Sequence, residues 1–124
     1  MKKTLTLLCL LTLQLNLSAQ QVQSSEEILA QGLELQKENK FREAIEWYMR
    51  IPLNDSNYYS GLYETGNCYY LDSQYTKALE ICKQALSKPN SERPSFYNLA
   101  GNILDDMGQP QQAIAWYDSA LKAY

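Results

Sequence analysis

The chain has 124 residues, a formal net charge of −3 at pH 7 and no histidine. This length suffices for one domain with a modest core, and the mildly acidic balance gives no electrostatic reason to bind nucleic acid. The sequence lacks the commonest general base and metal ligand, and it has no phosphate-binding loop, nucleophile elbow or HExxH motif. We therefore expect a protein that is not an enzyme and carries no cofactor or metal.

Residues 1–19 are predicted to be a secretory signal peptide. Two lysines precede a leucine-rich run over residues 5–17, and small residues follow it, which is the order found in such signals. About 13 residues are too few to span a bilayer, so a membrane anchor is disfavoured. We expect cleavage after Ala19 or Gln20, a short linker over residues 20–24, and no membrane insertion of the mature chain.

Three glycines mark a repeated unit, because they are separated by 34 and 35 residues. Each glycine is followed twelve residues later by an alanine, and four residues after that by a tyrosine or a cysteine. A glycine inside a helix costs about 1 kcal/mol relative to alanine, so three at one phase indicate close packing of two helices. The predicted repeat-packing pairs are Gly32 with Ala44, Gly66 with Ala78, and Gly101 with Ala113.

The first unit, residues 25–58, is predicted to contain two helices. Ser24 and Glu27 have the spacing of a capping box, in which each side chain satisfies the backbone N–H of the other at the start of a helix. Pro52 cannot continue a helix, so we expect the second helix of this unit to be short.

The second unit, residues 59–93, and the third, residues 94–124, follow the same pattern. In both, apolar residues recur at helical spacing on either side of a short polar break. Pro89 ends the last helix of the second unit. Pro110 suits the first position of the final helix, where a missing N–H costs nothing.

The third unit is predicted to lack a capping helix. Solenoids usually cover their last apolar face with a polar element, and the sequence ends at Tyr124. We expect Ala113, Ala120 and Leu121 to meet water unless another segment or another protein covers them. We favour a longer protein of which this chain is a fragment.

A period of 34 residues with two helices resembles the tetratricopeptide repeat. The resemblance covers residues 25–124 and implies an all-α fold, a right-handed α-solenoid of three repeats. At the position where the family's repeats begin with a tryptophan-type residue, this chain has Ile28, Leu62 and Tyr97. The residues that carry the resemblance are Gly32, Ala44 and Tyr48; Gly66, Tyr69, Ala78 and Ala85; and Gly101, Ala113, Tyr117 and Ala120.

In that family the first helix of each pair lines a concave groove, so the resemblance implies a scaffold that holds a protein or peptide partner there. Asn67 and Asn102 each follow a repeat glycine, and we expect them to lie side by side. An amide both donates and accepts hydrogen bonds, as a peptide backbone does. A solvated polar face with ordinary hydrogen bonds between repeats would suit the same positions. The candidate groove residues are Leu33, Lys37, Tyr63, Asn67, Tyr70, Asn98, Asn102 and Asp105.

The charges in this predicted groove favour a neutral or basic partner. Some tetratricopeptide domains hold a C-terminal carboxylate with a set of lysine, arginine and asparagine side chains. Here Lys37 is the only cation, next to Glu64, Asp105 and Asp106, and such a clamp would fail electrostatically.

Cys68 and Cys82 remain after signal cleavage, and both are expected to be free thiols. Antiparallel pairing of the two helices offsets them by about 9 Å along the axis at about 1.5 Å per residue, which exceeds the reach of a disulfide. Cys82 is expected to act as a small core residue.

The style of the signal and its Ser-Ala-Gln end resemble exported proteins of Bacteroidota, so we expect a periplasmic location. Two other functions stay open. The repeats could be the N-terminal sensor part of a longer signalling receptor. They could also be an accessory glycan-binding component in which Tyr63, Tyr70 and Asp105 hold a sugar.

Overall fold

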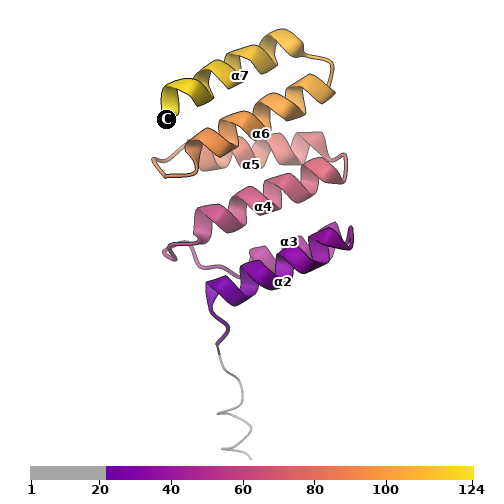
Figure 1. Cartoon of the computed structure of the whole chain (residues 1–124), viewed down its shortest axis with the longest axis vertical. Coiled ribbons are helices and arrows are strands. Elements are labelled where there is room, and N and C mark those ends of the chain that lie inside the picture. The colour runs from indigo at the N-terminus through magenta and orange to yellow at the C-terminus, as the bar shows by residue number, and fades with distance from the viewer. Residues whose placement is uncertain (1–21) are drawn as a thin grey trace, which may run out of the picture.

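The computed structural model describes residues 22–124, in which the chain folds into three consecutive helix pairs. The predicted signal peptide lies outside the described residues. The pairs stack in chain order, with α2, α4 and α6 forming one row and α3 and α5 lying behind it (Figure 1). The helices are α2 (Ser25–Lys37), α3 (Phe41–Tyr48), α4 (Tyr58–Leu71), α5 (Tyr75–Leu86), α6 (Arg93–Asp106) and α7 (Pro110–Ala123).

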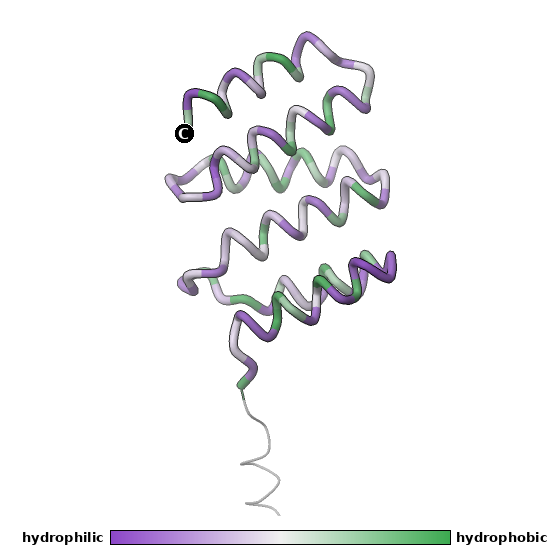
Figure 2. The backbone as a smooth tube through the Cα atoms, viewed as in Figure 1, coloured by the Kyte–Doolittle hydropathy of each residue, from purple (hydrophilic) through white to green (hydrophobic). Residues whose placement is uncertain are grey.

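This arrangement confirms the predicted all-α solenoid of helix pairs. Each helix packs chiefly against its neighbours in the sequence, and α4 also contacts α6. Apolar residues are spread along every helix in short stretches, as the amphipathic pattern requires (Figure 2). Within residues 22–124, no helix is both long and apolar enough to cross a membrane.

The start of the first helix is fixed by the predicted capping box. The Glu27 backbone N–H donates to Ser24 Oγ at 3.2 Å, and the Ser24 N–H donates to Glu27 Oε2 at 3.1 Å. These two bonds satisfy backbone donors that have no partner inside the helix. The structure therefore confirms this part of the sequence prediction.

The tight turn inside each pair uses one residue in the left-handed region, two positions before the second helix. These residues are Asn39 with φ of 60°, Ser73 with φ of 58° and Gly108 with φ of 76°. Glycine adopts this region freely and asparagine tolerates it, whereas serine does so less readily. The same backbone device therefore closes all three turns although the sequence differs at each.

Helix α3 is the short helix that Pro52 predicted, with 8 residues against 12 in α5 and 14 in α7. The chain then forms a turned segment that is anchored to the start of the fold. Asn57 Nδ2 donates to Ser25 Oγ and to Glu26 Oε1, both at 2.9 Å. The loop after α3 is thus held against α2 even though the helix ends early.

The three repeat glycines lie in close helix crossings, but their nearest neighbours differ from the expected alanines. A Cβ on Gly32 would overlap the ring of Tyr48, and a Cβ on Gly101 would overlap the ring of Tyr117. Long side chains in a helix lean toward its N-terminus, so a tyrosine one turn after the alanine covers the alanine's turn. The alanines Ala44, Ala78 and Ala113 are themselves buried.

The core lies between successive pairs and includes both cysteines. Phe96, Ile103, Cys68 and Cys82 have the largest side chains that are fully buried. Both thiols are free, and burial raises the pKa of each to about 12. They are therefore protonated at neutral pH and pack as small core groups.

The outer face of α7 only partly matches the expectation for the last repeat. Ala113 and Ala120 were expected to meet water but are buried against α6. Leu121 is 73 % exposed, as expected, and Ile114 is 57 % exposed although the equivalent Ile45 is buried. The difference arises because α4 covers α3, whereas within residues 22–124 no later helix covers α7.

Candidate partner-binding groove

The predicted groove residues lie on α2, α4 and α6, which form one row of first helices (Figure 1). On α2, Leu33 is 39 % exposed and Lys37 is exposed. Lys37 Nζ lies 2.7 Å from Glu34 Oε1 on the same helix, so its charge is already paired with an acid. Exposed pairs of this kind contribute little to stability, and this lysine adds little net positive charge to the row.

The two tyrosines on α4 have structural partners. The ring of Tyr63 packs edge-on against Phe96, with 5.8 Å between the ring centroids. The hydroxyl of Tyr70 donates to Asp106 Oδ2 at 2.7 Å, which joins the second pair to the third. That hydrogen bond to Asp106, followed by burial, raises the pKa of Tyr70 to about 12. Both side chains therefore tie neighbouring repeats together.

The three predicted groove asparagines differ in their exposure and in their hydrogen bonds. Asn102 is exposed, but its Oδ1 accepts a hydrogen bond of 2.7 Å from the Tyr117 hydroxyl, which leaves its amide N–H groups for a ligand. Asn67 and Asn98 are half-buried. Asp105, the last of the predicted residues, is exposed at the end of α6.

Gln36 joins three helices at one edge of the row. Its Oε1 accepts from the Tyr48 hydroxyl at 3.0 Å and from Cys68 Sγ at 3.4 Å, so it connects α2 to α3 and α4. Burial, with smaller effects from Glu64 and Cys68, raises the pKa of Tyr48 above its ordinary value. Among the described residues, every buried side-chain nitrogen and oxygen has a hydrogen-bond partner.

Glu64 is the half-buried acid at the centre of the row. Burial raises the pKa of its carboxyl, hydrogen bonding from Gln36 and Asn67 lowers it, and the charge of Glu92 raises it again. No ion pair within residues 22–124 involves this carboxylate. A cationic group brought by a partner would therefore find an unpaired acid here.

The predicted groove residues, taken together, can hydrogen-bond and carry acidic charge. Their amides can pair with a peptide backbone, and the acids Glu64, Asp105 and Asp106 outnumber Lys37, which is already paired. In the described part of the chain, no group of three or more metal-binding side chains lies together. This arrangement can bind a segment by polar contacts.

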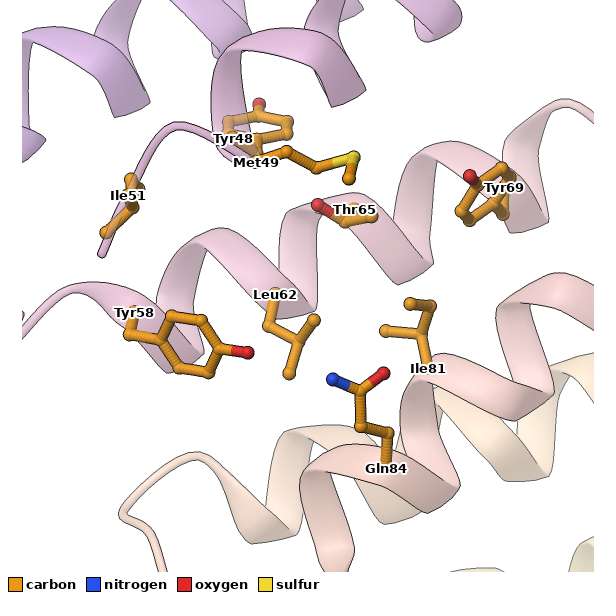
Figure 3. A pocket seen from close by; sticks show the side chains of 9 residues that line it. All are labelled: Tyr48, Met49, Ile51, Tyr58, Leu62, Thr65, Tyr69, Ile81 and Gln84. Carbon is orange, nitrogen blue, oxygen red and sulfur yellow. The ribbon is translucent and has the colours of Figure 1, made fainter. Parts of the chain in front are cut away.

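Sequence reasoning missed an apolar pocket on another side of α4. The cavity measures about 230 Å³ and lies between α3, α4 and α5 (Figure 3). The only signal in the sequence was Pro52, which predicted the short α3 but not the space beside it. Its lining residues are Tyr48, Met49, Ile51, Tyr58, Leu62, Thr65, Tyr69, Ile81 and Gln84.

Comparison with models of protein families gives a match over most of the helical region. A family model described as anaphase-promoting complex, cyclosome, subunit 3 matches residues 37–120, which is more than half of the chain. That model represents a tetratricopeptide-type repeat family. No curated protein gives a significant match.

Proposed function

Since the chain belongs to the tetratricopeptide-type family described as anaphase-promoting complex, cyclosome, subunit 3, we propose that it is a non-catalytic scaffold whose groove holds a neutral or basic peptide segment. Membership of this repeat family supports a role in protein–protein interaction. The chemistry of the predicted groove residues supports the binding of a peptide segment there.

One observation carries the proposal: α2, α4 and α6 carry amides together with the acids Glu64, Asp105 and Asp106, which form no ion pair within residues 22–124. Asn67 follows Glu64 by three positions on α4, and Asn102 precedes Asp105 by three positions on α6, while Lys37 is already paired with Glu34. A peptide backbone needs donors and acceptors, and a lysine or arginine in that peptide would pair with the acids. Acidic partners would meet repulsion from the same side chains.

The glycan alternative has less support from the same residues. Sugar sites usually offer a free aromatic face beside a carboxylate. Tyr63 packs against Phe96, and the Tyr70 hydroxyl is bonded to Asp106. The ring of Tyr70 also packs against the ring of Tyr75, with 6.0 Å between the centroids, so each of the two rings already has an aromatic neighbour.

Export to the periplasm is part of the proposal and rests on the order of charged, apolar and small residues over residues 1–19. N-terminal sequencing of the mature protein should read from Gln20 or Gln21. A mature chain that still carries residues 1–19 would contradict cleavage.

The groove is tested by replacing Asn67 and Asn102 together with alanine. We expect about tenfold or weaker binding of short lysine- and arginine-containing peptides, because each lost hydrogen bond contributes about 1 kcal/mol. Fluorescence anisotropy with the full chain measures this. The matched control replaces Asn54 and Gln112, which are exposed and outside the groove, with alanine.

The companion experiment compares two peptide sets of equal length, one basic and one in which aspartate and glutamate replace the basic residues. Basic peptides should bind more tightly, and added salt should weaken them. Equal binding of the acidic set, or unchanged binding by the double variant with normal helicity, would show that the partner does not lie in this groove.

A further inference from the structure

Glu64 lies where the first helices of the three pairs approach one another (Figure 1). Its carboxyl accepts hydrogen bonds from Gln36 on α2 and from Asn67 on its own helix. Glu92, which directly precedes α6, is close enough for its negative charge to raise the pKa of Glu64. The carboxyl therefore has neighbours on α2, on α4 and at the start of α6, the row in which the proposed function places a peptide segment.

The hydrogen bonds of Gln36 determine which of its amide atoms serves Glu64. Gln36 Oε1 accepts from the Tyr48 hydroxyl at 3.0 Å and from Cys68 Sγ at 3.4 Å. Since the amide oxygen is occupied by these two donors, the amide N–H groups are left for the Glu64 carboxylate. Tyr48 and Cys68 are both buried, so the core fixes this orientation. The carboxylate is therefore held in place before a ligand binds, which lowers the entropy cost of binding.

The Glu64 carboxylate keeps hydrogen-bonding capacity after these two bonds are made. An ionised carboxylate offers about four acceptor sites on its two oxygens. Gln36 and Asn67 each occupy one of them, so about two sites are left for a ligand. The Asn67 amide donates to Glu64 through its nitrogen, and its Oδ1 can accept from the same ligand. The two side chains, three positions apart on α4, therefore offer adjacent acceptors.

In the described part of the chain, Glu64 forms no ion pair. Lys37 and Arg93 directly follow, in the sequence, two of the neighbours of Glu64, but both are engaged elsewhere. Lys37 Nζ pairs with Glu34 at 2.7 Å, and Arg93 Nη1 donates to the backbone carbonyl of Leu86 at 2.7 Å. The influences that lower the pKa of the Glu64 carboxyl are hydrogen bonds rather than a positive charge. A cation for this carboxylate must therefore come from a partner.

The half-buried position of Glu64 favours a guanidinium over an ammonium group. A guanidinium is planar and carries its N–H donors in a rigid fork that matches the two oxygens of a carboxylate. It is also more weakly hydrated than an ammonium, so it loses less hydration energy on entering a partly buried site. The ammonium of lysine is a compact, strongly hydrated charge and gains less from paired acceptors. Arginine is therefore the better match for this carboxylate.

We propose that Glu64 determines the specificity of the groove by binding an arginine side chain of the partner segment. This inference rests on the proposed function, because it places that arginine in the same groove. The guanidinium bonds the remaining acceptor sites of the Glu64 carboxylate and Asn67 Oδ1. Its positive charge also offsets the repulsion between Glu64 and Glu92. The partner is thus a peptide segment with an arginine, and a lysine at the same position binds less tightly.

The test uses the full chain and the arginine-containing peptides of the groove experiment, each also made with citrulline or lysine in place of one arginine. Fluorescence anisotropy compares the wild type with Glu64→Gln and with the matched control Glu46→Gln, which removes the same charge from an exposed position on α3. At one arginine position, citrulline should weaken binding to the wild type by about tenfold or more, and lysine by a smaller factor. Glu64→Gln should bind the arginine peptide about as weakly and should no longer distinguish arginine from citrulline. Glu46→Gln should behave as the wild type.

A capped amino acid tests the same contact without a peptide backbone. N-acetyl-arginine amide, titrated into the isotopically labelled chain, should shift the side-chain amide signals of Gln36 and Asn67, and N-acetyl-citrulline amide should not. Glu64→Gln should abolish these shifts while its circular dichroism stays that of the wild type. The proposal is overturned if Glu64→Gln and Glu46→Gln bind the arginine peptides equally, or if capped arginine leaves both amide signals unchanged. Failure of the proposed function would instead appear as equal binding of the acidic peptide set, whatever the Glu64 variant does.

Discussion

Replacing Gly66 with leucine is expected to lower the free energy of unfolding by about 2 kcal/mol or more. A Cβ at this position would lie 3.1 Å from Ile81 Cγ2 and 3.3 Å from Leu99 Cδ2. These neighbours belong to α5 and α6, so a leucine would force apart both its own helix pair and the next repeat. Overpacking a core typically costs about 1–3 kcal/mol and occasionally more. For a side chain as large as leucine we expect this cost to exceed the roughly 1 kcal/mol gained by removing a helical glycine.

Urea unfolding followed by circular dichroism measures this effect, with Gly66→Ala as the control. Alanine adds only the Cβ, and the side chains of Ile81 and Leu99 need to move by a few tenths of an ångström. We expect Gly66→Ala to lie close to the wild type, because the strain and the helix propensity oppose each other. An unchanged midpoint for the leucine variant would mean that α4 is not packed as described.

Replacing Phe96 with alanine is expected to cost about 4 kcal/mol, the largest effect of any single truncation considered. Phe96 is fully buried on α6, where it packs with Ala78, Cys82 and Ala85 of α5 and contacts the ring of Tyr63. The small α5 residues cannot fill the space that the ring leaves. The lost stability therefore has two parts: the free energy of transferring the ring out of water, and the cost of the cavity that stays unfilled.

The matched control for this variant is Tyr124→Ala, since Tyr124 is an aromatic residue that is 86 % exposed. Surface substitutions of this kind change stability by about 0.5 kcal/mol or less. Calorimetry of the two variants compares them directly. If Phe96→Ala costs no more than Tyr124→Ala, α5 and α6 do not share a core.

The sequence predicts most of the fold because the same weak pattern of glycine, alanine and large apolar residues occurs in three successive units. One glycine in a helical pattern is weak evidence, but three glycines at the same phase, each followed by an alanine twelve residues later, indicate helix pairs. Ser24 with Glu27 and Pro52 act locally, through backbone donors and ring geometry, so the sequence shows them without tertiary information. The structure bears out the capping box and the short helix α3.

Contacts between repeats are less visible in the sequence. The ring of Tyr48, rather than Ala44, lies nearest Gly32. Long side chains of a helix point toward its N-terminus, so the Tyr48 ring covers the turn that contains Ala44. Ile114 has the phase of Ile45 but is exposed, since α4 packs on α3 whereas no later helix within residues 22–124 packs on α7. A periodic pattern states which positions are equivalent, whereas burial depends on what covers each one.

The candidate site was less predictable than the fold for a similar reason. The hydrogen bond between Tyr70 and Asp106 joins residues 36 positions apart, and the sequence offers no local pattern for it. Gln36 likewise accepts hydrogen bonds from the Tyr48 hydroxyl and from Cys68 Sγ, which lie 12 and 32 positions away in the sequence. Pro52 predicts the early end of α3, but the pocket beside it is lined by residues from three helices, and the sequence offers no local pattern for that grouping.

Nuclear Overhauser contacts of the Gly66 Hα protons test the stacked-repeat account most directly. In an isotopically labelled chain, the account predicts strong cross-peaks from these protons to the Ile81 methyl on the partner helix and to a Leu99 methyl on the next repeat. The first contact reports the helix pair and the second reports the stacking of repeats. Absence of both cross-peaks in a folded, helical sample would contradict the account.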